Sequence, residues 1–266
     1  MTCRRNDVRP YGGQATVYDR EYRCHVLDVR LYLDRLRYHR VRGPVLELGV
    51  GTGRVAAPIA TAGYSVTGID LSDSMLRQAR RLRGALDPAV AARLRFCKAD
   101  MASFQLKGTF AAILIPFSTL NLLLDDSART TCLELCHDHL EPGGLLWLDA
   151  PIPPKPGADG KLPERRFTSK IPLSRYGHVM EKETIDRPDV ALGIDEITYR
   201  YRETREDDGL VVRAYDVVFQ MARLSPAEVQ EAVEAAGFDV MERFGDYLGS
   251  PFGPAADRLV IEAVRP

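Results

Sequence analysis

The stretch 44-PVLELGVGTG-53 decides how the rest of the chain is interpreted. It begins with a short apolar run, which is typical of a buried β-strand, and glycines follow at positions 49, 51 and 53. Glycine carries no Cβ, so the backbone can turn sharply at these positions and a ligand can lie directly against it. Ligands of open α/β sheets bind beyond the carboxyl ends of the strands, so the stretch predicts a binding site at this turn.

Strands and helices alternate along the chain on both sides of the turn. Apolar residues at helical spacing predict a leading amphipathic helix within 14–40. Further patterning predicts strands over 64–70, 93–100, 109–116 and 145–151, and helices over 56–63, 71–82 and 125–140. This order predicts a parallel sheet with helices on both faces.

The pattern changes after Ala150. Residues 151–172 contain six prolines, which do not fit a central strand or a helix interior, so we expect a surface loop there. Alternating apolar and polar residues predict three antiparallel strands in a small inserted sheet, over 177–186, 194–206 and 210–224. The closing elements are expected to be a helix over 225–237 and strands over 238–248 and 257–266.

Composition excludes several classes of protein. The chain has 266 residues, a formal net charge of -1 and a pI near 6.5, whereas nucleic-acid binding needs a surplus of Lys and Arg. No apolar run is long enough to cross a membrane, and no signal peptide is expected. The five cysteines are odd in number and scattered, which favours reduced thiols. We therefore expect a cytoplasmic protein that binds neither nucleic acid nor membrane, as a monomer or homodimer.

Two acidic residues follow the next predicted strands. Asp70 ends the strand after the glycine turn, where a carboxylate can accept both hydroxyl protons of a ribose, and Asp100 ends the following strand, within reach of an adenine amino group. The pattern G-x-G-x-G differs from the G-x-G-x-x-G of dinucleotide sites, which disfavours NAD without excluding it. A structural turn followed by solvated acids is the remaining alternative.

At these positions the sequence resembles the class I S-adenosylmethionine-dependent methyltransferases. VLELGVGTGRV, TGIDLSDSMLRQAR and FCKADM resemble their first three motifs, and FAAILIPFSTLNLL with HLEPGGLLWLDAP the fourth and fifth. The resemblance covers about residues 14–150 and returns from 225 to the end. It implies an α/β fold, a Rossmann-like seven-stranded sheet with an antiparallel last strand, and S-adenosyl-L-methionine as methyl donor with S-adenosyl-L-homocysteine as product.

The resemblance also implies a division of the chain. Residues 1–150 and 221–266 would form the cofactor-binding core, with 14–40 as a capping helix, and 151–220 would form an insert on the acceptor side. The closing segment 245–266 is similar to the tail of bacterial amine-directed members, including peptide N-terminal methyltransferases. The NPPY sequence of base-modifying DNA methyltransferases is absent, since PFST stands at 116–119.

Cofactor contacts can be carried over onto matching positions. The resemblance implies that the methionine part lies at the glycine turn, the ribose at Asp70, the adenine near Asp100, and a capping tyrosine above. The full set expected to bind the cofactor is Tyr18, Glu47, Gly49, Val50, Gly51, Asp70, Leu71, Met75, Asp100, Met101 and Phe117.

The acceptor is expected between the strand ends and the inserted sheet. Tyr199 and Tyr201 share one face of a predicted strand, and Arg200 and Arg202 the other; the tyrosines would either line the pocket or pack the sheet against the core. The residues expected to bind the acceptor are Tyr22, Ser118, Asn121, Asp149, Tyr199 and Tyr201. Asp149 would instead cap the following loop in the alternative interpretation.

No catalytic base is established by the sequence. His178 and Tyr201 are the candidates, although a lone surface histidine is the alternative for the first. An amine that arrives neutral needs no base, so we expect an N-methyltransferase acting by proximity on a small molecule or peptide. An O-methyltransferase, a cyclase that consumes the cofactor itself, and an NAD(P)-dependent oxidoreductase remain open alternatives.

A metal site is not expected. Cys132, Cys136 and His139 share one helix face, but a structural zinc requires a fourth ligand and none is evident nearby. Thiols are among the most buried residue types, so core packing is the favoured interpretation.

Overall fold

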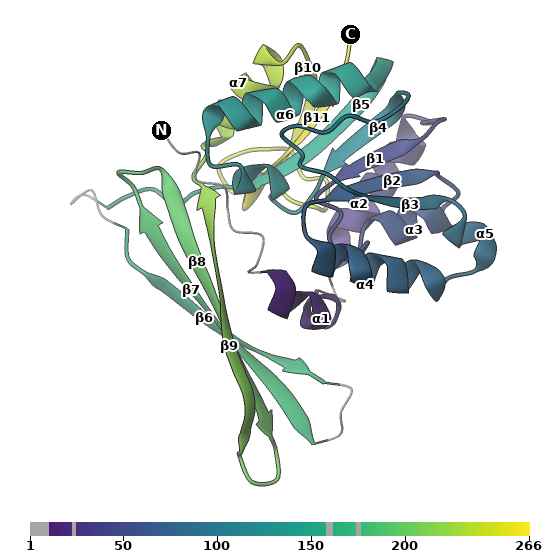
Figure 1. The fold of residues 1–266 in the computed structure, drawn as a ribbon. Helices are drawn as coiled ribbons and strands as arrows, with labels where there is room; N and C mark the ends of the chain where they lie inside the picture. Colours follow the sequence, from purple (N-terminus) through teal and green to yellow (C-terminus); the bar gives the residue numbers. More distant parts are fainter. Residues whose placement is uncertain (1–10, 23–24, 158–161, 174–176) are drawn as a thin grey trace.

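The computed structural model describes residues 11–22, 25–157, 162–173 and 177–266, and its centre is a seven-stranded sheet in the order β10-β11-β5-β4-β1-β2-β3 (Figure 1). Strands β1 to β5 pair in parallel with one another, whereas β11 runs antiparallel to both β5 and β10. This confirms the predicted antiparallel last strand. The bounds are β1 Val45–Leu48, β2 Val66–Asp70, β3 Leu94–Lys98, β4 Phe110–Ile115, β5 Leu140–Pro151, β10 Asp239–Phe244 and β11 Arg258–Val264.

Helices cover both faces of this sheet, and the alternation of side chains along the strands builds one core on each face. In β4, Ile113 and Ile115 pack in the cluster that contains residues of α6 and α7, whereas Ala112 and Leu114 pack with α2, α3 and α4. The bounds are α2 Leu27–Tyr38, α3 Ala56–Thr61, α4 Asp73–Gly84, α5 Pro88–Ala91, the 3₁₀ helix η1 Thr119–Leu122, α6 Asp126–His139 and α7 Pro226–Ala235.

Helix starts follow their capping residues. The Ser225 hydroxyl accepts a hydrogen bond from the Glu228 N–H (3.2 Å), and the Glu228 carboxylate accepts one from the Ser225 N–H (2.7 Å). This capping box fixes the start of α7, and Ser72 caps α4. Because α4 begins directly after β2, its cap also fixes the chain beside Asp70.

A second, four-stranded antiparallel sheet is inserted between β5 and α7, in the order β6-β7-β8-β9. Its strands are β6 Arg165–Pro172, β7 His178–Asp189, β8 Ile194–Arg205 and β9 Val211–Ala222. Only three strands were expected, because β6 falls within the proline-rich stretch predicted to be a loop. That prediction was wrong for 165–172: the strand is an edge strand, where proline is tolerated, and Pro172 stands at its last position.

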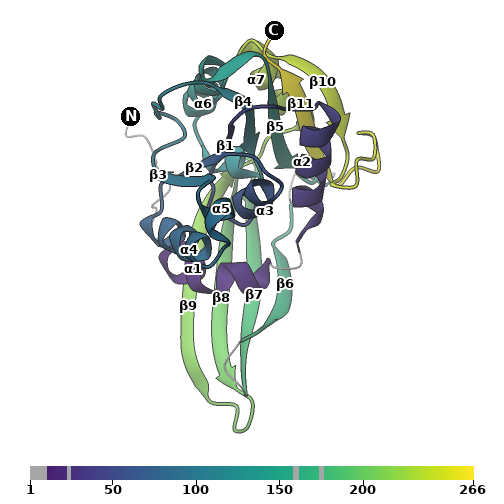
Figure 2. The same cartoon turned by 90° about the vertical axis from the view of Figure 1, so that its right-hand side faces the viewer.

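The predicted leading helix is two helices. Helix α1 covers Tyr11–Glu21, and α2 begins at Leu27 and packs on the main sheet. Helix α1 instead lies across the inserted sheet and beneath α4 (Figure 2). The single helix over 14–40 was therefore wrong, and its two parts contact different sheets. Within the described ranges, no helix is both long and apolar enough to span a membrane.

Candidate active site

The turn after β1 lies at the carboxyl edge of the main sheet. Gly49, Gly51 and Gly53 all have positive φ, at 67°, 54° and 84°. A Cβ on Gly49 would lie 2.4 Å from Thr119 Cγ2, so glycine is required there for η1 to approach. A Cβ on Gly51 would meet nothing closer than a carbonyl oxygen at 3.9 Å. The backbone at Gly51 is therefore open to a ligand.

Asp70, at the end of β2, closes this turn against the next helix. Its carboxylate accepts hydrogen bonds from the Gly51 N–H and the Ser72 N–H, both at 2.8 Å. Each oxygen makes one of these bonds and can accept another, since a carboxylate oxygen has two lone pairs. Burial raises the pKa of Asp70 above its ordinary value, while the backbone donors oppose that shift. The side chain is thus held rigidly with acceptor capacity left over.

Glu47, in β1, is a buried acid with one unsatisfied hydrogen-bond acceptor. Its side chain is 1% exposed, and Oε2 has no hydrogen-bond partner among the described residues. Burial raises the pKa of Glu47 well above its usual range. A cationic ligand group placed beside it would favour the ionised carboxylate and satisfy this oxygen.

These residues open onto a cavity of about 700 Å³. One wall consists of the loops that follow the main strands, and the facing wall consists of the inner face of the inserted sheet together with α1. Every residue predicted to bind the cofactor lines this cavity: Tyr18, Glu47, Gly49, Val50, Gly51, Asp70, Leu71, Met75, Asp100, Met101 and Phe117. Four of the residues predicted to bind the acceptor also line it: Tyr22, Ser118, Asn121 and Tyr199.

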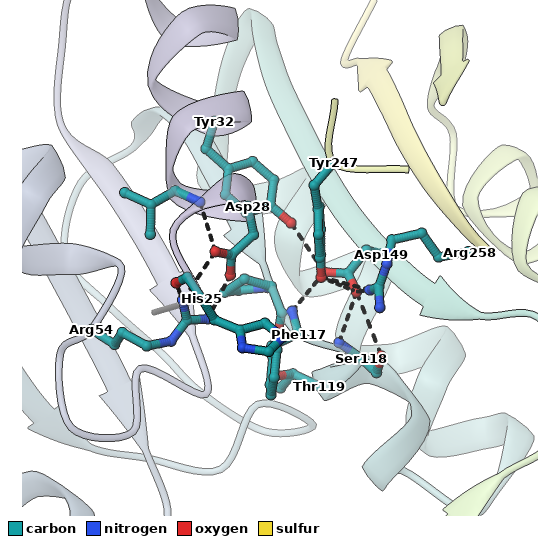
Figure 3. A network of polar contacts seen from close by, with 12 residues as sticks. His25, Asp28, Tyr32, Arg54, Phe117, Ser118, Thr119, Asp149, Tyr247 and Arg258 are labelled. Carbon is teal, nitrogen blue, oxygen red and sulfur yellow. Dashed lines mark hydrogen bonds and ion pairs between the residues drawn. The ribbon is translucent and has the colours of Figure 1, made fainter. Parts of the chain in front are cut away.

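Asp149 does not line the cavity, contrary to its predicted contact with the acceptor. It is fully buried and surrounded by donors (Figure 3). Its carboxylate accepts from the Phe117 N–H (2.5 Å), the Ser118 N–H (3.1 Å) and the Arg258 guanidinium (2.8 Å). The Tyr32 and Tyr247 hydroxyls donate to it as well, at 3.0 and 2.9 Å.

The consequence of this network is a fixed loop. Phe117 and Ser118 both adopt left-handed backbone conformations, with φ of 59° and 60°, which are unfavourable for residues with a Cβ. The Asp149 carboxylate holds both of their N–H groups. Asp149 therefore positions the loop that lines the cavity and does not itself line it.

Arg54, which the sequence did not single out, connects the glycine turn with the N-terminal helices. Its guanidinium forms an ion pair with the buried Asp28 (2.5 Å) and donates to the His25 carbonyl (2.8 Å). It also lies 5.0 Å from the centre of the Phe117 ring, which packs against the Tyr22 ring at an interplanar angle of 77°. Figure 3 shows Arg54, Asp28 and Phe117 together beside the Asp149 network. The turn and the aromatic wall of the cavity are thus held by one cation.

Comparisons with known proteins identify the chemistry of this site. Residues 45–144 match the family model described as a methyltransferase domain. A dTDP-3-amino-3,4,6-trideoxy-alpha-D-glucopyranose N,N-dimethyltransferase of Streptomyces venezuelae is 26% identical over 79% of this chain and 79% of its own. The cypemycin N-terminal methyltransferase of a Streptomyces species is 25% identical over 82% and 81%.

A solved structure supports the same conclusion. A glycopeptide N-methyltransferase in complex with S-adenosyl-L-homocysteine superposes with a TM-score of 0.58, at 26% identity, over 89% of this chain and 87% of that one. The chain is an S-adenosylmethionine-dependent methyltransferase. Its matched domain contains the glycine turn, Asp70 and Asp100.

The cavity of the methyltransferase fits this cofactor. Gly51 leaves the backbone open where the methionine part would lie, and the orphaned oxygen of Glu47 would accept from its ammonium group. The spare acceptor capacity of Asp70 suits the two ribose hydroxyls, and Asp100 faces the same cavity from the end of β3. The fit rests on groups that other parts of the protein do not occupy: the open backbone at Gly51, the Glu47 oxygen and the remaining acceptor capacity of Asp70.

Tyr199 and Tyr201 share the inner face of β8, as the alternation predicts, but they do different things. Tyr199 lines the cavity, whereas Tyr201 is fully buried and its hydroxyl donates a hydrogen bond to the Glu21 carboxylate of α1 (2.9 Å). Glu21 also forms an ion pair with Lys182, whose ammonium lies 3.4 Å from the centre of the Tyr199 ring. Tyr201 thus helps to attach α1 to the inserted sheet and does not contact the cavity.

The catalytic candidate His178 lies outside the cavity as well. It begins β7, is 6% exposed, and its Nδ1 lies 3.0 Å from a carboxylate oxygen of Glu203 on β8. This pairing gives His178 a structural partner in the inserted sheet.

The cysteine and histidine face of α6 is part of the core. Cys132 and Cys136 are fully buried in the larger hydrophobic cluster. The two ring nitrogens of His139 are bound to the Leu135 carbonyl (2.7 Å) and the Leu106 N–H (3.2 Å). Both nitrogens are therefore engaged by the backbone. In the part of the chain that the structure describes, no group of three metal-ligating side chains occurs.

Proposed function

We propose that this methyltransferase methylates a neutral amine of a small molecule or a peptide. The observation that carries the proposal is the state of the tyrosines on the cavity wall. Burial raises the pKa of Tyr199 to about 12, and it also raises the pKa of Tyr18 and Tyr22 above their ordinary value. These phenols stay protonated at neutral pH, so they do not supply the base that a hydroxyl acceptor needs.

A protonated tyrosine suits an amine acceptor instead. Its oxygen can accept an N–H hydrogen bond, which leaves the amine lone pair free to point at the reacting carbon. When bound, the cofactor would supply an activated methyl group on a sulfonium. The protein contributes orientation, an effect that can supply roughly 7–11 kcal/mol. Phe117 and Ser118, held by Asp149, and Tyr199 would define where the acceptor lies.

The relatives support the same acceptor class. The Streptomyces venezuelae protein is named for N,N-dimethylation of an aminosugar nucleotide, and the cypemycin enzyme for a peptide N-terminus. Both names specify amines attached to larger polar molecules. An aminosugar or a peptide terminus is therefore the acceptor class we infer for this enzyme.

An amino alcohol tests nitrogen against oxygen within one molecule. Aminocyclohexanol is incubated with the enzyme and methyl-labelled cofactor, and the labelled product is located by NMR. We expect label on nitrogen and release of S-adenosyl-L-homocysteine. Label confined to oxygen would contradict the proposal, and release of methylthioadenosine without methyl transfer would indicate a cyclase.

The pH profile gives a second test, with a defined sign. Only the neutral amine has a free lone pair, so kcat/KM should rise with pH until the pKa of the acceptor amine is reached. Across a series of acceptors with different amine pKa values, the pH at which the rise in kcat/KM ends should follow the pKa of each amine. If kcat/KM stopped rising at the same pH for every acceptor, the titrating group would be a base on the enzyme, and the proposal would be contradicted.

A further inference from the structure

Four charged side chains gather on the inner face of the inserted sheet and line the same cavity. Arg165 in β6 stands opposite Asp186 in β7, and the two form an ion pair. Asp195 in β8 pairs with Arg223, which follows β9, at 2.5 Å. These residues play no part in the cofactor contacts described above, because they belong to the wall that faces the main sheet.

The two ion pairs differ in how well they are satisfied. Arg223 uses its second nitrogen to donate to the Pro154 carbonyl (2.9 Å), so this pair is supported on both sides. In the first pair, Asp186 Oδ1 and Arg165 Nε are both buried atoms without a hydrogen-bond partner among the described residues. The Asp186 side chain is only 7% exposed. Buried polar atoms are normally paired, and such orphans are costly unless a ligand completes them.

The orphaned atoms specify the chemistry of what would complete them. One is a hydrogen-bond acceptor and the other a donor, and they belong to side chains that are directly opposite each other across two strands. Two arginines and two aspartates cancel in charge, so the cluster favours neither a cation nor an anion. A neutral group that both donates and accepts matches this arrangement.

We propose that Asp186 and Arg165 bind a hydroxyl or amide group of the acceptor, separate from the amine that is methylated. This subsite rests on the proposed amine methylation and deepens it, because it predicts a second recognised group on the acceptor. The group donates to Asp186 Oδ1 and accepts from Arg165 Nε. A sugar hydroxyl and a peptide amide both have this capacity, and the test separates them.

The experiment compares matched acceptors. Aminocyclohexanol is paired with methylcyclohexylamine, and alaninamide with the amine in which an isopropyl group replaces the carboxamide. The ratio of kcat/KM within each pair is measured for the wild-type enzyme and for Asp186→Asn and Arg165→Lys. The first substitution removes the anionic acceptor, and the second keeps the ion pair while removing Nε.

A control variant exists on the opposite face of the same two strands. Glu183 in β7 forms a cross-strand ion pair with Arg166 in β6 (2.9 Å) but does not line the cavity. Glu183→Gln should therefore leave the acceptor ratios unchanged. Thermal unfolding and cofactor affinity of each variant establish that a change in ratio is not a loss of folding.

We expect the wild-type enzyme to prefer the hydroxyl or the amide member of one pair by about tenfold or more, since a site built to bind a polar group rejects an analogue without it. Both Asp186→Asn and Arg165→Lys should reduce that preference. The pair in which the preference is found identifies the bound group of the acceptor as a hydroxyl or an amide. Equal ratios in wild type and both variants would overturn the subsite.

Failure of the subsite can be told apart from failure of the proposed function. If no amine is methylated, the proposed function is wrong, and binding of aminocyclohexanol and alaninamide to the enzyme loaded with S-adenosyl-L-homocysteine is measured by calorimetry. Weaker binding by Asp186→Asn than by Glu183→Gln supports the subsite independently. Equal binding by the two variants overturns it.

Discussion

Replacing Asp149 tests whether one buried carboxylate holds the cavity loop in place. In Asp149→Ala the Arg258 guanidinium, 22% exposed, loses its buried anionic partner and keeps only the exposed Asp257 at 3.8 Å, and the Tyr32 and Tyr247 hydroxyls lose their acceptor. Removing one partner of a buried ion pair typically costs about 3–5 kcal/mol. Because Arg258 keeps some solvent contact, we expect a loss near the lower value, about 3 kcal/mol in the free energy of unfolding.

Asp149→Ala should also weaken binding of the cofactor. Without the carboxylate, the N–H groups of Phe117 and Ser118 lose the acceptor that holds their left-handed conformations. The loop can then relax, so we expect weaker cofactor binding in calorimetric titration, even at temperatures where the variant is folded. A substitution that affected stability alone would leave that affinity unchanged.

Urea unfolding followed by circular dichroism measures the stability effect. Asp239→Ala, at an exposed position in β10, is the matched control and should change stability by less than about 0.5 kcal/mol. Asp149→Asn keeps the shape of the side chain but not its charge, and it should fall between the two. A loss below about 1 kcal/mol for Asp149→Ala, with unchanged cofactor affinity, would refute the argument.

Three further predictions concern the walls of the cavity. Asp70→Ala should weaken cofactor binding several-fold or more while circular dichroism remains native-like; unchanged affinity in calorimetric titration would contradict the ribose contact. Because burial raises the pKa of Glu47, its carboxyl is protonated in the free enzyme at low pH, so affinity for the cationic cofactor should rise with pH through that raised pKa. Glu47→Gln should abolish this dependence, and the same slope in wild type and variant would count against it. Lys182→Met should leave the half-buried Glu21 without its ion-pair partner, so limited proteolysis should cleave within α1 sooner than in wild type; equal rates would show that the pair does not hold α1.

The sequence predicted the main sheet well, because several of its strands are followed by a local signal. The glycine turn after β1 and Asp70 after β2 are read from adjacent residues, and parallel strands bring their carboxyl ends to one edge. All of the residues predicted from these local motifs line the cavity. Strand β6 was missed because prolines on either side of it outweighed the short alternating pattern within 165–172.

The supporting network could not be predicted, because its members are far apart in the chain. Tyr32 and Asp149 are 117 positions apart, and Arg258 lies a further 109 positions beyond Asp149. Their contact depends on α2 and β11 meeting β5, which no local pattern specifies. Arg54 belongs to the same class of omission: it stands beside the glycine turn, but its role depends on Asp28 of α2.

The inner face of the inserted sheet shows what the alternation of side chains along a strand can and cannot predict. It correctly places Tyr199 and Tyr201 on one face and leaves Arg200, which pairs with Glu183 and Asp216, on the exposed face. It cannot show that Glu21 covers Tyr201 while Tyr199 stays open to the cavity, since α1 comes from the other end of the chain. Cofactor residues therefore follow from local motifs, whereas acceptor residues depend on which element covers the inserted sheet. Changes on that sheet should consequently alter acceptor choice while leaving the cofactor wall intact.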